Sequence, residues 1–175
     1  METSTQTPPT VTAVALRYGV FTGIISILYS FVLIISRQVG NTALGWVALI
    51  IPIIGIVLAM RDFRSRNGGY LSYGEGMGIG VLLSLVSGLL STVFNFVYRL
   101  IDPGVTEQAI EQVRTKLEAG GNLSDEQIDQ AIAMSQKFTT GPIGFAFGII
   151  LSLITGVILS LIIAAILKNP KPEFE

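Results

Sequence analysis

The sequence contains no cysteine and no histidine among its 175 residues. Without thiols the chain can form neither a disulfide nor a thiolate nucleophile, and without imidazole it lacks the commonest metal ligand and general base. Charged residues are also scarce, at 13%, and the formal net charge of −1 offers no basic excess for binding nucleic acid. We therefore predict no nucleic-acid partner, no cofactor and no metal site.

Apolar residues take the place of charge, making up 50% of the chain and giving a mean hydropathy of +0.66. Four stretches of at least 19 residues contain no charged residue, at 18–36, 42–60, 76–98 and 141–167. At 1.5 Å per residue, each can cross the roughly 30 Å hydrocarbon core of a bilayer as a helix. The expected fold is all-α: a single polytopic membrane domain, 1–175, with four transmembrane helices at about 14–36, 42–60, 71–101 and 141–167.

A polar segment at about 103–139 separates the third and fourth expected spans. From Asp102 to residue 139 there are seven carboxylates and three basic side chains, the reverse of an apolar span. Apolar residues recur at helical spacing before Gly120 and Gly121, and Ser124 with Gln127 has the pattern of a capping box that opens a second helix. The segment is predicted to be a soluble helical hairpin.

Basic residues indicate the orientation of the four spans. Arg61, Arg64 and Arg66 follow the second span, and Lys168 and Lys171 follow the fourth. With four crossings these residues lie on the same side as both termini, and the excess of basic residues marks that side as cytoplasmic. The hairpin is then extracytoplasmic.

Small residues recur at every fourth position of the fourth span: Gly144, Gly148, Ser152, Gly156, Ser160 and Ala164. In lipid, such residues let helix backbones approach closely. Each four-residue step turns about 40° past a full circle, so one straight partner is not expected to cover the whole row. The fourth span is predicted either to contact two neighbours, one at each end, or to cross its partner steeply.

The third span carries its small and polar residues within a sector of roughly 100°: Gly76, Gly80, Ser84, Ser87, Ser91 and Asn95. This face predicts tight packing against the fourth span. The primary interpretation of both rows is a folding device, and the alternative is that they also line a path for a solute.

Six residues are candidates for solute or helix contact: Glu75, Asn95, Gly76, Gly80, Gly148 and Gly156. Glu75 could bind a cation or proton at a cavity mouth, although a carboxylate in a first helical turn is also simply favoured by the helix dipole. Asn95 could select a solute or hydrogen-bond a neighbouring helix. No catalytic motif is found, and we predict that the protein is not an enzyme.

Three features resemble a bacterial family of four-helix membrane proteins catalogued as domain of unknown function 4199. They are the sequence GYLSYGE at 69–75, Ile101-Asp102-Pro103 at the exit of the third span, and the helical insert before the fourth. The resemblance implies a bacterial envelope protein without an established activity, and it supplies no catalytic residue. We therefore expect the bacterial inner membrane as its location.

Two functional hypotheses follow for a protein whose first partner is the lipid bilayer. The leading one is an accessory or scaffold protein, whose small-residue faces and hairpin bind a second copy or another membrane protein. The alternative is a small transporter or channel subunit that acts as a homo-oligomer, because four helices alone seldom enclose a solute route.

Overall fold

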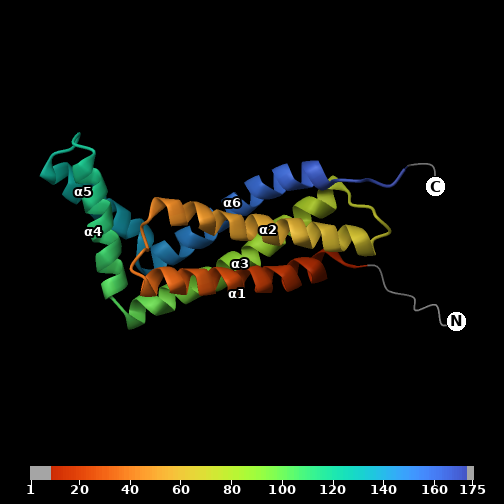
Figure 1. Cartoon of the computed structure of the whole chain (residues 1–175), viewed down its shortest axis with the longest axis horizontal. Coiled ribbons are helices and arrows are strands. Elements are labelled where there is room, and N and C mark those ends of the chain that lie inside the picture. The colour runs from red at the N-terminus through yellow and green to blue at the C-terminus, as the bar shows by residue number, and fades with distance from the viewer. Residues whose placement is uncertain (1–8, 173–175) are drawn as a thin grey trace.

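Six helices account for most of the described chain in the computed structural model, which describes residues 9–172 (Figure 1). The four long apolar helices are α1 (Val11–Ile35), α2 (Thr42–Arg66), α3 (Tyr73–Ile101) and α6 (Gly141–Leu167). The shorter helices α4 (Gly104–Ala119) and α5 (Asp125–Thr139) form the predicted hairpin at one end of the bundle. The all-α architecture with four membrane-length helices is confirmed.

Polar side chains at the helix starts satisfy backbone N–H groups that have no partner within the helix. Ser72 and Glu75 form a capping box before α3, in which the Ser72 N–H donates to Glu75 Oε2 over 2.7 Å. The capping box predicted at Ser124 and Gln127 opens α5. Each box satisfies two donors reciprocally, so these residues fix where α3 and α5 begin.

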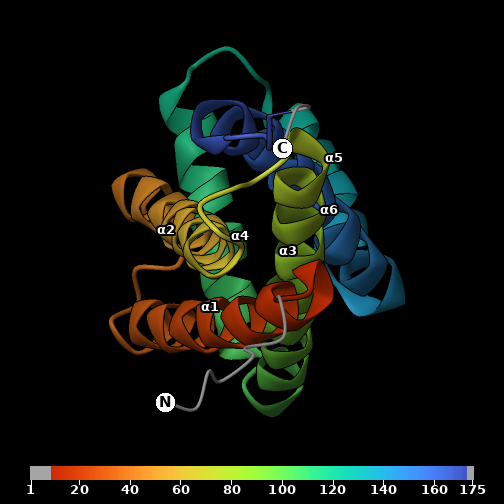
Figure 2. The same ribbon diagram turned by 90° about the vertical axis from the view of Figure 1, so that its right-hand side faces the viewer.

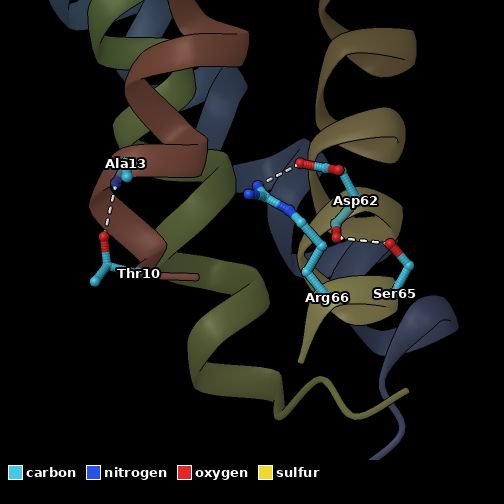
Figure 3. A network of polar contacts seen from close by, with 5 residues as sticks. All are labelled: Thr10, Ala13, Asp62, Ser65 and Arg66. Carbon is cyan, nitrogen blue, oxygen red and sulfur yellow. Dashed lines mark hydrogen bonds and ion pairs between the residues drawn. The ribbon is translucent and has the colours of Figure 1, made fainter. Parts of the chain in front are cut away.

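The helix α2 continues six residues beyond the predicted span, through the arginine-rich segment to Arg66. Basic side chains are favoured in the last turn of a helix by its dipole, and Arg66 also pairs with Asp62 one turn earlier, at 2.6 Å. Figure 3 shows this pair near Thr10, whose hydroxyl accepts from the N–H of Ala13 at the start of α1. Polar contacts thus gather at the end of the bundle opposite the hairpin, called here the termini end.

The order of the helices is seen along the bundle axis in Figure 2. α3 lies between α1 and α6, while α2 lies beside α1 and touches α3 and α6 less extensively. At the hairpin end the starts of α2 and α6 lie on opposite sides of the bundle, and the two helices converge toward the termini end. The bundle is therefore tighter at one end than at the other.

Small residues of α3 and α6 face one another at every fourth position, with the helices antiparallel. The opposed pairs are Gly76 with Ala164, Gly80 with Ser160, Ser84 with Gly156, Gly88 with Ser152, and Thr92 with Gly148. A methyl group added at Gly76 would lie only 2.9 Å from Cβ of Ala164, closer than real Cβ contacts come. The two backbones therefore approach as closely as small side chains permit.

The small-residue row of α6 meets two neighbours, and α3 is the larger of them. α3 meets the row from Gly148 to Ala164, whereas Gly144 lies against the backbone of Thr139 at the end of α5. One helix covers most of the row because α3 is not a uniform partner. α3 carries its own row with the same four-residue step, so both rows drift by the same angle and can stay in contact as the helices wrap around each other.

The row assigned to α3 from sequence also divides between two neighbours. The side of α3 that faces α6 carries Gly76, Gly80 and Ser84. Ser87 instead lies toward α1, since a Cβ added at Gly23 of α1 would be 3.2 Å from the Cα of Ser87. Gly19 makes a second close approach to α3, where an added Cβ would lie 3.1 Å from the carbonyl oxygen of Leu83. α3 thus uses small residues on both α1 and α6, which explains its central place.

The buried core lies in the termini-end half of the bundle. Ile56 and Met60 of α2, Ile79 and Leu83 of α3, and Ala164 of α6 are completely buried within one cluster. Beyond this cluster, an antiparallel bridge between Leu71 and Asn169 joins the segment before α3 to the segment after α6, with N···O distances of 2.8 and 2.7 Å. Side chains and backbone together close this end.

The hairpin is attached to the bundle by cationic side chains. Lys116 of α4 donates to the carbonyl oxygen of Gly40, between α1 and α2, at 2.5 Å. Within the hairpin, Arg114 pairs with Asp129 at 2.5 Å, and this hydrogen bond raises the pKa of the already basic guanidinium. The hairpin is therefore tied both to itself and to the α1–α2 connection.

The α3–α6 contact predicts an asymmetric response to added bulk. Gly156→Leu should destabilise the protein by at least about 1–3 kcal/mol, because Ser84 already occupies the space that the new side chain needs. Gly45→Leu is the matched control, since nothing lies within 4 Å of a Cβ at Gly45. Thermal unfolding in lipid nanodiscs measures the difference. The two variants could instead unfold at the same midpoint temperature while only Gly156→Leu loses a specific oligomer. That result would favour an intermolecular role for Gly156.

A candidate ligand cavity between the helices

A cavity of about 500 Å³ lies in the hairpin-end half of the bundle, where α2 and α6 are apart. All four long helices contribute to its wall, and Phe138 and Thr139 at the end of α5 lie over its hairpin end. The volume is within the range of pockets that hold small molecules in proteins. Polar side chains that line it are Ser26, Ser84, Ser87, Ser91, Thr92, Asn95, Arg99, Ser152 and Thr155.

One wall is a polar row along α3. Ser84, Ser91, Asn95 and Arg99 recur at intervals of four or seven residues, so the helical repeat brings them to one side. The Asn95 side chain donates to the carbonyl oxygen of Ser91 at 2.8 Å, which fixes the amide against its own helix. This row leads from the middle of α3 to its hairpin end.

The hydroxyl of Ser84 is an unsatisfied buried group at the inner end of this row. Its Oγ has no hydrogen-bond partner among the described residues, and the residue is only 4% exposed. Its carbonyl oxygen, by contrast, accepts from the hydroxyls of Ser152 at 3.1 Å and Ser87 at 3.4 Å. This Oγ packs against Gly156 of α6, so the cost of about 1–3 kcal/mol for a buried donor without a partner belongs to the close α3–α6 contact.

Pro52 frees a backbone acceptor on the opposite wall. It lies inside α2 and has no N–H, so the carbonyl of Ala48, one turn earlier, loses its helical donor. Ala48 and Pro52 both line the cavity and are its only contacts with α2 in the described residues. The carbonyl of Ala48 therefore lacks its usual helical donor beside the cavity.

Arg99 is half-buried at the hairpin end of the cavity. Its Nη1 donates to the carbonyl oxygen of Thr139 at 2.6 Å, linking α3 to the end of α5. The ion pairs within residues 9–172 involve Arg66 and Arg114, so Arg99 has no carboxylate partner there. A guanidinium has five N–H donors in a planar fork, and several of them remain for another acceptor.

Aromatic rings complete this end of the cavity. Phe96 of α3 packs edge-on against Phe145 of α6, with ring centroids 5.5 Å apart, and Phe138 of α5 lies 5.6 Å from Phe147. All four rings line the cavity. These large rings lie between α3 and α6 and between α5 and α6, where small residues would allow the helix backbones to approach more closely.

The structure brings only three of the six sequence candidates to this cavity. Asn95, Gly148 and Gly156 line it. Gly76 and Gly80 instead pack against Ala164 and Ser160 nearer the termini end.

Glu75 lies near the termini end as well, where its carboxylate caps its own helix and accepts from Ser72. The sequence interpretation missed Arg99 because it lies at a span end, although it continues the Ser91 and Asn95 spacing.

The fold and cavity define an integral membrane protein with four spanning helices. The four helices have windows of mean hydropathy between 2.0 and 2.9 and expose much of their apolar surface, as lipid contact requires. The chain belongs to the family described as protein of unknown function DUF4199, whose match covers residues 17–169. Neither a curated protein nor a solved structure matches the chain.

Thiol chemistry tests whether water reaches the cavity, since the natural chain has no cysteine. In protein freed of bound lipid, a Ser91→Cys variant should react with a small water-soluble methanethiosulfonate roughly tenfold faster than Leu83→Cys or Val93→Cys, because only a hydrated thiol forms the reactive thiolate. Leu83 is fully buried, and Val93 is on the exposed, lipid-facing side of the same helix. Mass spectrometry of labelled protein gives the rates. A Ser91→Cys rate as low as that of Leu83→Cys would contradict a hydrated cavity.

Proposed function

We propose that this protein is a membrane-embedded binding protein that takes a small ligand into the cavity of its hairpin-end half. The observation that carries the proposal is a cavity of about 500 Å³ between the helices whose wall contains Asn95 and the half-buried Arg99. Polar groups inside a membrane bundle are costly, and in membrane proteins they commonly mark a binding site or pathway.

The shape of the bundle supports binding from one side. The cavity ends at the closed core of the termini-end half, where Ile56, Met60 and Leu83 are completely buried. A continuous pore is therefore not formed by one chain in this conformation. Binding at the hairpin end is compatible with a transport subunit that opens to the other side in a second conformation.

This proposal favours the alternative sequence hypothesis over the leading one. The scaffold hypothesis relied on small-residue faces and on the hairpin. Of these, the small residues Gly76, Gly80, Gly148 and Gly156 all approach residues of the same chain. Surfaces already used within the protein are not free to bind a partner.

The hairpin, the other feature of the scaffold hypothesis, still supports an accessory role through its exposed apolar side chains. Leu123 and Met134 are 40% and 63% exposed. In that role the hairpin, rather than the glycine rows, would contact a second copy or another membrane protein.

Cavity filling tests the proposed function. A Ser91→Phe variant should lose small-molecule adducts that wild-type protein retains in native mass spectrometry from nanodiscs, because the new ring takes up the space of the ligand. Val93→Phe is the matched control, since it adds the same ring to the same helix on its exposed side. Thermal unfolding of both variants verifies that they fold. Equal adduct occupancy in the two variants, or no adduct in wild-type protein, overturns the proposal.

The proposed orientation has the hairpin outside and both termini in the cytoplasm of a bacterial cell, with the protein in the inner membrane. The three arginines near the end of α2 support it. In intact expressing cells, an impermeant maleimide should label Glu126→Cys on the hairpin and should label Ser65→Cys only after permeabilisation. Both positions are exposed, so accessibility to the reagent depends on the side of the membrane. The reverse pattern would overturn the orientation.

A further inference from the structure

The structure points to the class of ligand, an inference that rests on the proposed binding function. We infer that the cavity holds an anionic lipid, with its acid group paired to Arg99 and one acyl chain lying along α3 between α2 and α6. Three independent features carry this inference: the free capacity of Arg99, the depth of the cavity, and the side on which it opens.

Arg99 provides the charge. Its fork of donors matches the oxygens of a carboxylate or phosphate, and only one bond, to the carbonyl of Thr139, occupies it within the described residues. Burying a guanidinium halfway without a carboxylate partner costs free energy. An anion that binds beside Arg99 is therefore held more tightly than one beside a fully exposed arginine. Arg99 is also two residues from the end of α3, at the level where lipid headgroups lie.

The cavity has the depth of one lipid leaflet. Its α3 wall extends from Ser84, near the middle of the helix, to Arg99. Fifteen residues at 1.5 Å each span about 22 Å, and half of a bilayer with its headgroups measures about 20–22 Å. A headgroup at Arg99 would therefore place the end of its chain near Ser84, at the centre of the membrane.

The lateral walls favour a lipid over a water-soluble acid. α2 and α6 diverge toward the hairpin end, and α2 contributes only Ala48 and Pro52 to the lining (Figure 2). The lining is mostly apolar by area, with phenyl rings next to the headgroup level. A chain can enter sideways from the leaflet on the side where α2 contributes least to the wall, whereas a short hydrophilic anion would leave the apolar lining and the phenyl rings without a contact.

The test compares three probes in phosphatidylcholine nanodiscs: oleate, oleyl alcohol and hexanoate. Oleyl alcohol has the same chain without the charge, and hexanoate has the same acid on a short chain. Ligand-dependent thermal stabilisation gives relative affinities. Wild-type protein should prefer oleate over the alcohol by roughly tenfold, the scale of one charge-assisted hydrogen bond. Arg99→Gln should remove this preference, while Arg99→Lys should keep part of it.

Arg114→Gln provides the matched control, because it removes the same charge from the exposed hairpin, where Arg114 pairs with Asp129, and should leave the preference unchanged. The oleate-to-alcohol ratio is an internal standard, so a general loss of stability in Arg99→Gln does not imitate the expected result. Equal binding of oleate and oleyl alcohol by wild-type protein overturns the charge assignment and leaves the cavity function standing. Hexanoate binding as tight as oleate overturns the lipid assignment. Failure of all three probes to stabilise the protein contradicts the binding function itself.

Discussion

The close approach of α3 and α6 is the contact on which the remaining structure depends. Lipid tails are as apolar as the side chains that face them, so no hydrophobic effect draws these helices together. What holds them is dispersion between backbones that small residues allow to touch, repeated in five opposed pairs from Gly76 with Ala164 to Thr92 with Gly148. Each opposed pair fixes the same register, so the register of the whole contact is specified several times.

That contact also explains why a cavity forms. α6 follows α3 along most of its length, and α2 stays beside α1, to which Gly55 brings it close at Thr22. Toward the hairpin end α2 diverges from α6, while α1 stays against α3, where Phe31 packs edge-on against Phe94 and Tyr98. The bond from Arg99 to Thr139 then holds α5 over the opening. A tight half and an open half thus occur along the same four helices, according to whether α2 lies close to α6.

The sequence allowed most of the fold to be predicted and only part of the site. Helix existence followed from uncharged length, and the hairpin from Ser124, Gln127 and the glycines before them, because these signals are local. The pairing of α3 with α6 was also visible in their small residues. Arg99 was missed as a site residue, since its importance depends on what surrounds it rather than on its own neighbours in the chain. Glu75 was a candidate for solute contact, but its carboxylate lies three residues after Ser72 and accepts from the Ser72 N–H, so it caps its own helix.

By itself, the sequence determined that the chain crosses a membrane with four helices, since an uncharged helix of 19 or more residues is stable only where lipid covers it. It also determined which helical faces permit close approach. Only the tertiary structure decided that α3 meets the row of α6 from Gly148 to Ala164, and that Ser87 turns to α1 instead. It alone left Ser84 without a partner beside a cavity, and placed Arg99 at the open end of that cavity. These features depend on how α3 and α6 wrap around each other and on where α2 diverges from α6. Such geometry arises from contacts between residues far apart in the chain.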